Sequence, residues 1–295
     1  MPDFIFSSTC FKECDLSRLL YFLAENNIDG LEISGNLMRK SHGDIVQLMN
    51  EYKDRINFYI HNYFPIPASP VVLNPAMEKT AAYTITRCKK AIDLCVEFNI
   101  PFYSMHAGMA FDPNPGDLGN SQAHFEPISL NESRDILVRS CVEIAEYAKI
   151  RGVGVLLENN VAANINCPNR LNDRYHLADP DESSKLIGLF DNSNLGMLLD
   201  VGHLKVSAQT LGFDPKIFIA NFRRHIRAVH ISDNNGNEDQ HLLINSDMWF
   251  CDYLPWNQIR YVSLEITGQT VGKLLSQMRI VRKRIMESKN VTIVA

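Results

Sequence analysis

Histidines and carboxylates recur where apolar segments of this sequence come to an end. "NFYIHN" and "PFYSMHA" each end near a histidine, and "GVGVLLENN" ends on a glutamate followed by two asparagines. The full set is His61, His106, Glu158, Asp200, His203, His230, Asp239, His241 and Glu265. Imidazole and carboxylate groups bind Zn²⁺, Mn²⁺, Fe²⁺ and Co²⁺, and they also act as general acids and bases. The set therefore indicates a divalent-metal centre, provided that these segment ends meet in space.

Each of these residues also has an ordinary interpretation. A single histidine at a strand end is more often a hydrogen-bonded polar residue than a metal ligand, and a single glutamate often forms an ion pair or caps the next helix. The occurrence of all nine residues at segment ends makes a shared metal site the better interpretation. Like charges crowded into a partly buried site are costly, and a bound cation relieves that cost.

The segments that carry these residues are predicted to be strands of a parallel sheet. Eight apolar, β-rich runs occur along the chain, at 3–9, 30–34, 57–62, 101–107, 152–160, 195–203, 226–232 and 261–267. Most are continuous apolar runs rather than strict alternations, which is typical of parallel strands covered by helices.

Helical patterns separate most of these strands. "DLSRLLYFLAENN" begins with Asp15 as a predicted N-cap and spaces Leu16, Leu19, Leu20 and Leu23 along one helical face. Further helices are predicted at 75–99, 131–152, 181–190, 214–225 and 269–288. The segment between the last two strands is the weakest, with at most a short helix near 247–258.

Eight strands alternating with helices, without a Gly/Ser linker, predict a single (β/α)₈ TIM barrel over residues 1–295. The alternative is a doubly wound open sheet, but "SSTCFKECD" after the first strand has no glycine for a dinucleotide-binding turn. Long irregular segments follow the fourth and fifth strands (107–129 and 159–180). Long loops after strands are expected at a barrel's C-terminal face, where all the strand ends named above would converge.

Bulk composition limits the class of protein. Hydrophobic residues make up 45% of the 295 residues and charged residues 21%, and the net charge is −5. This charge does not favour broad capture of nucleic acid, although a local basic groove is compatible with it. The seven cysteines form an odd set without zinc-finger spacing, which favours free thiols. We expect a cytoplasmic protein without a signal peptide or membrane span.

Four motifs resemble the xylose isomerase-like barrel superfamily, which contains sugar isomerases and epimerases together with endonuclease IV. They are "LLENN", "LLDVGH", "AVHISDNNGNEDQHL" and "SLEIT". In the epimerase branch the resemblance implies one divalent ion, such as Zn, Mn, Co, Fe or Mg, held by Glu158, Asp200, His230 and Glu265. It further implies that the two glutamates act as the acid/base pair and that His203 contacts a substrate hydroxyl.

In the endonuclease branch the resemblance implies three zinc ions held by all nine residues named above. Asp239 and His241 are expected on the same side of an extended segment, after a turn at Asn235 and Gly236. Two departures count against a DNA repair enzyme. The chain continues as "LLINSDMWFCDYLPW" where that branch has a Gly-rich turn, and "LEISGNLMRKSHGD" has no clear basic and aromatic DNA-penetrating loop.

The sequence therefore predicts a metal-dependent sugar or sugar-phosphate isomerase or epimerase that uses one to three ions. The alternative is a zinc phosphodiesterase resembling endonuclease IV, for which nucleic acid would be the partner. A metal-binding barrel without catalysis is a third interpretation, and the presence of both glutamates argues against it.

Glu32 is predicted to contact a sugar hydroxyl or to form a buried pair, and Lys205 to bind a phosphate or to be solvated. The segment with Arg170, Arg174, Tyr175 and His176 is predicted to cover the pocket. The expected partner is a small sugar or sugar phosphate, with no membrane contact, and a homo-oligomer is compatible with the sequence.

Overall fold

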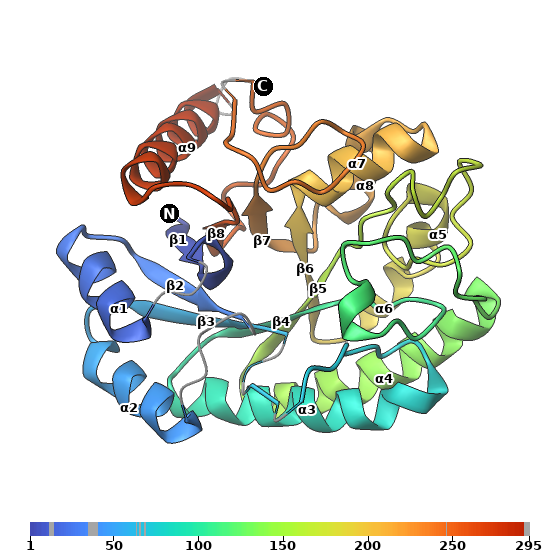
Figure 1. Ribbon diagram of the computed structural model, residues 1–295, viewed down its shortest axis with the longest axis horizontal. Coiled ribbons are helices and arrows are strands. Elements are labelled where there is room, and N and C mark those ends of the chain that lie inside the picture. The colour runs from blue at the N-terminus through green and yellow to red at the C-terminus, as the bar shows by residue number, and fades with distance from the viewer. Residues whose placement is uncertain are drawn as a thin grey trace.

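Eight parallel strands close into one barrel in the computed structural model, which describes residues 1–11, 15–34, 41–62, 64, 66–67, 69–245 and 247–291. The strands follow one another around the barrel in chain order, and the last pairs with the first. Figure 1 shows the strands surrounded by helices. The predicted (β/α)₈ barrel is confirmed.

All eight predicted strands are present, each shorter than its apolar run. They are β1 Asp3–Ser7, β2 Gly30–Ile33, β3 Asn57–His61, β4 Phe102–His106, β5 Gly154–Glu158, β6 Leu195–Asp200, β7 Ile226–Ile231 and β8 Tyr261–Leu264. Their central residues are almost entirely buried, because one face lines the barrel interior and the other is covered by helices. This two-sided burial is why the sequence shows continuous apolar runs.

The helices cover the outside of the barrel. They are α1 Leu16–Glu25, α2 His42–Tyr52, α3 Glu78–Glu97, α4 Leu130–Ile150, α5 Pro180–Ser184, α6 Ile187–Asn192, α7 Val201–Leu211, α8 Pro215–Phe222 and α9 Val271–Val291, with 3₁₀ turns η1 Ser8–Cys10 and η2 Pro115–Asp117. In α1, Asp15 caps the amides of Ser17 and Arg18, as predicted, and the four leucines of its inner face are buried. The long helices α3 and α4 lie side by side in Figure 1.

Two helices were not predicted. Helix α2 has only two buried apolar residues, Ile45 and Met49, so its periodic signal is weak. Helix α7 begins at Val201, immediately after β6, so the prediction of a strand over 195–203 was wrong beyond Asp200. Asp200 ends the strand and caps the helix, because its Oδ1 accepts a hydrogen bond from the amide of His203.

One other predicted helix differs from the structure, and the segment expected to hold at most a short helix has none. The segment 181–190 divides into α5 and α6 rather than forming one helix. Residues 247–258, all of them described, form turns without a helix. Trp256 is buried there, and its indole N–H donates to the carbonyl of Cys251. No helix among the described residues combines the length and apolar character of a membrane span.

Strand register brings the predicted site residues together. His106 lies beside Glu158 across β4 and β5, and Asp200 lies beside His230 across β6 and β7. Glu265 follows β8 directly, and its amide donates to the carbonyl of Ile231 at the end of β7. The C-terminal ends of neighbouring parallel strands lie at the same edge, so these side chains converge on one mouth.

Candidate metal centre

Buried histidines and carboxylates fill the C-terminal mouth of the barrel. Glu158 is 1% exposed, and Asp200 and His230 are fully buried. His61, His203 and Glu265 are also buried, while His106, Asp239 and His241 are half-buried at the rim. The structure thus brings together all nine residues that the sequence singled out.

Glu158 is the centre of the first group. Its Oε2 lies 3.2 Å from Nε2 of His61 and 3.4 Å from Nδ1 of His106. Its Oε1 lies 3.3 Å from Nδ1 of His230. The same Nδ1 is 3.5 Å from Oε2 of Glu265 and 3.9 Å from Oδ2 of Asp200. One carboxylate therefore contacts histidines on both sides of the mouth.

Asp239 is the centre of a second group. Its Oδ2 lies 3.2 Å from Nε2 of His203 and 3.0 Å from Nε2 of His241. The expected extended segment is wrong in detail, because His241 has a left-handed φ of 49°. The turn at Asn235 and Gly236 is present, since the side chain of Asn235 accepts the amides of residues 237 and 238 and Gly236 has a φ of 82°.

Hydrogen bonds fix the rings and carboxylates of the mouth. Asn159 accepts the amide of Asp200 and donates to its carbonyl, which joins the ends of β5 and β6. The carbonyl of Asn159 accepts a hydrogen bond from Nδ1 of His203, so the other ring nitrogen faces Asp239. Nδ1 of His61 is 3.0 Å from the hydroxyl of Ser104. No role was predicted for Asn159 or Ser104, although the asparagine after Glu158 and the strand alternation of Ser104 with His106 are visible in the sequence.

The electrostatics of the first group favour ionised glutamates. Burial raises the pKa of the Glu158 carboxyl, but His106, His230 and His61 outweigh burial and hold this pKa well below its usual range. The pKa of Glu265 is likewise well below its usual range, because His230 and His241 outweigh burial. Both carboxyl groups are therefore ionised, which is the form that binds a cation.

The pKa values of three other groups in the mouth are also shifted. Burial, with repulsion from Asp239 and Glu158, raises the pKa of Asp200 to about 6 despite the attraction of His203. Burial lowers the pKa of His106 to about 4, although Glu158 opposes this shift. Burial disfavours protonated His241, but Asp239 outweighs it and raises that pKa to about 9.

The residues present fit a divalent metal. Buried side-chain atoms without a hydrogen-bond partner gather here among the described residues, including Oε2 of Glu158, Oδ2 of Asp200, Nδ1 of His106 and Nδ1 of His230. Two triplets, His61–His106–Glu158 and Glu158–Asp200–His230, bring one ligand atom each to within 4.8 Å of one another. Buried polar atoms without partners are rare, and a cation would satisfy carboxylate oxygens and imidazole nitrogens together.

Glu32 and Lys205 already have protein partners. Glu32 is fully buried beneath His230, with its Oε2 2.7 Å from Nε2 of that ring. The ammonium group of Lys205 donates to Oδ1 of Asp233 and to the carbonyl of Asn234, both at 2.6 Å. Asp233 begins the loop that carries Asp239 and His241, because its backbone pairs with Leu242. Lys205 therefore anchors the base of that loop.

The long loops after β4 and β5 pack on each other. Met109 forms an antiparallel bridge with Tyr175, and the hydroxyl of Tyr175 donates to the side chain of Gln122. Of the residues predicted to cover the pocket, Arg174, Tyr175 and His176 are buried in this packing, whereas Arg170 is exposed. Their direct role is to join the two loops beside the mouth.

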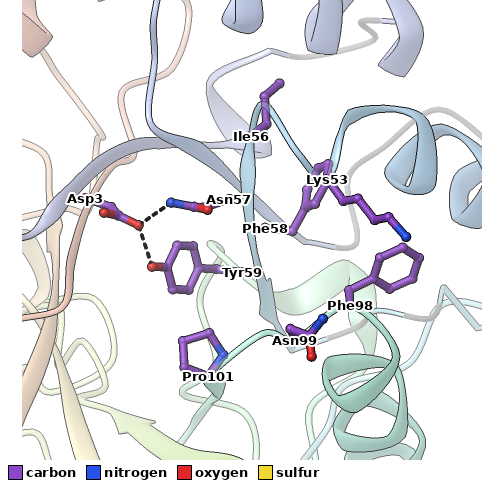
Figure 2. Close-up of a pocket in the computed structure, with 9 residues that line it drawn as sticks. All are labelled: Asp3, Lys53, Ile56, Asn57, Phe58, Tyr59, Phe98, Asn99 and Pro101. Carbon is purple, nitrogen blue, oxygen red and sulfur yellow. Dashed lines mark hydrogen bonds between the residues drawn. The ribbon is translucent and has the colours of Figure 1, made fainter.

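A separate cavity of about 270 Å³ opens at the opposite end of the barrel (Figure 2). It is lined by residues at the start of β1 and β3 and before β4, among them Asp3, Asn57 and Pro101. In Figure 2 the carboxylate of Asp3 accepts hydrogen bonds from Asn57 and from the hydroxyl of Tyr59. Barrel enzymes place their chemistry at the C-terminal face, so the metal-ligand cluster, not this cavity, is the candidate active site.

Comparison with known proteins defines the class. Residues 20–261 match the xylose isomerase-like TIM barrel family, and the chain belongs to this family. An uncharacterised protein of Methanocaldococcus jannaschii is 26% identical over 241 residues, covering 81% of this chain and 73% of the relative. The resemblance noted in the sequence is thereby confirmed.

Two solved structures show the range of functions found on this fold. A D-tagatose 3-epimerase-like protein has a TM-score of 0.71 and 21% identity, covering 98% of this chain and 99% of that chain. Endonuclease IV of Thermus thermophilus has a TM-score of 0.60 and 13% identity, covering 97% of this chain and 100% of that chain. At these identities the similarity establishes the fold, while the reaction must be argued from the site.

Proposed function

We propose that this protein is a divalent-metal-dependent isomerase or epimerase of a sugar or sugar phosphate. The observation that carries the proposal is the pair Glu158 and Glu265. The two carboxylates come from β5 and from the end of β8, and they approach the same nitrogen of His230 at 3.3 and 3.5 Å. Two carboxyl groups in one buried mouth, one acting as a carboxylate and the other as a carboxylic acid, are the minimal equipment for moving a proton across a bound substrate.

Glu158, Asp200, His230 and Glu265 would hold the metal in this proposal. A divalent ion bound there supplies a Lewis acid that polarises the carbonyl and hydroxyl oxygens of the substrate. Oε2 of Glu158, Oδ2 of Asp200 and Nδ1 of His230, which have no hydrogen-bond partner, support the assignment. Asn159 keeps the ends of β5 and β6 in register and so keeps Glu158 close to Asp200.

The two glutamates would carry the proton transfer. One, as the carboxylate, removes the proton from the carbon next to the substrate carbonyl, and the other, after taking up a proton from water, returns it on the opposite face and is left ionised. Their lowered pKa values suit either group to be the one that starts as the carboxylate. His203, whose ring is fixed by its hydrogen bond to the carbonyl of Asn159, would contact a substrate hydroxyl. Contact of Glu32 or Lys205 with the sugar stays a prediction.

Metal content and proton exchange test this proposal. Protein purified without chelator or nickel affinity resin should contain at least one Mn, Co, Fe or Zn per chain by elemental analysis. Keto-sugars incubated with it in D₂O should gain deuterium next to the carbonyl, as followed by NMR. Glu158→Gln and Glu265→Gln should each lower exchange about 10²- to 10⁴-fold. Glu182→Gln, which changes a buried glutamate outside the mouth, is the matched control. Exchange that survives Glu158→Gln would refute the mechanism.

A second candidate is a multinuclear zinc phosphodiesterase that acts on nucleic acid. The observation in its favour is the second group, in which Asp239 lies within 3.2 Å of the two histidines His203 and His241. With His61, His106 and Glu158, the mouth then offers ligands for up to three ions. Two or three zinc ions per chain, together with cleavage of abasic DNA, would favour this function over the first.

The remaining predictions about context are part of the same proposal. A small sugar is the expected partner, nucleic acid enters only with the second candidate, and the protein is expected to be cytoplasmic.

A further inference from the structure

Glu32 is a buried carboxylate to which the proposed chemistry gives no task. It lies on β2, in the barrel interior, and is fully buried together with His230 above it. Its Oε2 is 2.7 Å from Nε2 of His230, which is an ion-pair distance, but the ring N–H is angled too far from this line for the contact to be a hydrogen bond. Burying a carboxylate is costly unless charged and polar groups compensate it, so this close approach requires an explanation.

Two explanations of the short distance between Glu32 and His230 are compatible with the residues of the site. Glu32, His61 and His230 form a third triplet whose ligand atoms lie within 4.8 Å, so Glu32 is a candidate ligand of an inner metal ion. Alternatively, Glu32 accepts the Nε2 proton of His230 and acts on the metal only through that ring. The distances separate these two explanations.

The direct contact is the better fit. Two ligand atoms that share a tetrahedral ion at about 2.0–2.1 Å lie roughly 3.3 Å apart, which is well beyond the 2.7 Å found here. A charge-assisted N–H···O contact has a length of about 2.7–2.9 Å. Nε2 of His61, the other member of the triplet, already faces Glu158 at 3.2 Å. An inner ion would therefore compete with Glu158 for that nitrogen.

Glu32 is itself held from below. Its Oε1 accepts a hydrogen bond of 3.1 Å from the hydroxyl of Tyr261, which is fully buried. The ring of Tyr261 lies against the ring of Tyr59, with centroids 4.1 Å apart. Tyr59 is fixed in turn by its hydroxyl, which donates to Asp3 in the view of Figure 2. The carboxylate is therefore held by aromatic side chains that are themselves fixed, which restricts its movement toward a substrate.

We infer that Glu32 is a positioning residue that keeps the proton of His230 on Nε2 and leaves Nδ1 to bind the metal. Nδ1 is the nitrogen that faces Glu158, Asp200 and Glu265, so this tautomer is the one the proposed site requires. A carboxylate behind a metal-binding histidine orients the ring and increases its basicity. The inference rests on the metal centre of the proposed function, and not on the identity of the substrate.

Metal affinity and histidine NMR test the inference without any turnover assay. Zn²⁺ affinity would be measured by chelator competition for the wild type, Glu32→Gln and Glu32→Leu. Gln keeps an acceptor oxygen and Leu does not, so the loss should be 10- to 100-fold for Gln and larger for Leu. The matched control is Glu182→Gln. Glu182 is also buried and accepts a hydrogen bond of 2.8 Å from Nδ1 of His176, but it lies in α5, outside the mouth.

The NMR readout reports the ring directly. In the zinc-loaded wild type, long-range ¹H–¹⁵N spectra should show His230 bound through Nδ1 and protonated on Nε2. Glu182→Gln should leave both this pattern and the zinc affinity unchanged even if it lowers stability, which separates a positioning effect from a general loss of stability.

Four results would overturn the inference. A zinc affinity in Glu32→Gln equal to that of the wild type would show that Glu32 does not position His230. Zinc bound to Nε2 of His230 would show that the ring has the opposite tautomer. One ion fewer per chain in Glu32→Gln at saturating zinc would make Glu32 a ligand instead. A wild type that binds no metal would remove both the centre and the inference. Normal Glu32 results without deuterium exchange into any keto-sugar would refute only the isomerase proposal.

Discussion

Replacing Asp239 by Asn separates the two candidate functions. Asp239 joins His203 and His241 at 3.2 and 3.0 Å, and it contacts none of the groups assigned to proton transfer. Asn keeps the size of the side chain but removes the charged oxygen between the two rings. The second group would lose its only carboxylate, so an ion bound there should be held at least about 100-fold more weakly, or roughly 2.7 kcal/mol.

The first group should tolerate this change. Asp239 is one of the charges that raise the pKa of Asp200, so its removal makes Asp200 easier to ionise and does not withdraw a ligand from Glu158. If the protein is an isomerase that uses the first group, kcat/KM should fall less than about tenfold, or 1.4 kcal/mol. If it is a phosphodiesterase that needs the second group, the activation free energy of cleavage should rise by several kcal/mol, because the charge stabilisation that the bound ion provides is lost.

The assay combines metal counting with two activities. Wild type, Asp239→Asn and Glu238→Gln would be compared for metal per chain, for deuterium exchange into keto-sugars and for cleavage of abasic DNA. Glu238 is the matched control, because it is an exposed carboxylate on the same loop. Loss of exchange by more than about 100-fold in Asp239→Asn, with the metal content unchanged, would refute the assignment of proton transfer to Glu158 and Glu265 alone.

Three further predictions concern stability and the loop. Glu182→Ala should lower the free energy of unfolding by about 3–5 kcal/mol in urea, because it leaves His176 buried without its carboxylate partner; a loss below about 1 kcal/mol would contradict this. Lys205→Met should speed amide hydrogen exchange across 233–242, because it removes both hydrogen bonds at the base of the loop, whereas the exposed Lys185→Met should not. In chelator-treated protein, the pKa of His241 is about 9 against an ordinary 6.5, so the folded state binds this proton more tightly than the unfolded chain. Its stabilising contribution is complete below about pH 6.5 and is lost as the pH rises through 9, so urea midpoints should fall less over this range in His241→Gln than in the wild type.

The strand pattern was the most predictable part of this protein. Parallel strands buried on both faces are largely apolar along their length, so most of the eight strands were visible as continuous apolar runs. Helix prediction succeeded where burial and capping agree locally, as at Asp15, and failed for α2, where only Ile45 and Met49 mark the inner face. The end of β6 was misplaced because Val201 continues the apolar run although Asp200 already caps a helix.

The convergence of the site also followed from the sequence, once the barrel was assumed. In that fold every strand end reaches the same mouth, so the position of Glu158, Asp200, His230 or Glu265 in its own segment sufficed to place it. Contacts inside the mouth were beyond such reasoning. A strand defines the face on which a side chain lies, but the closure of the barrel decides which side chains meet across it.

Tertiary structure alone therefore decided the finer features. Glu32 meets His230 because β2 and β7 face each other across the barrel interior, and no spacing in the chain encodes that meeting. His241 contacts Asp239 from a left-handed backbone conformation, which the extended segment expected from the sequence did not include. The sequence by itself determined which side chains lie at the C-terminal mouth, because each one's position at the end of its strand can be read from its own segment. Which of them share one ion or one proton depends on distances that exist only after the barrel closes.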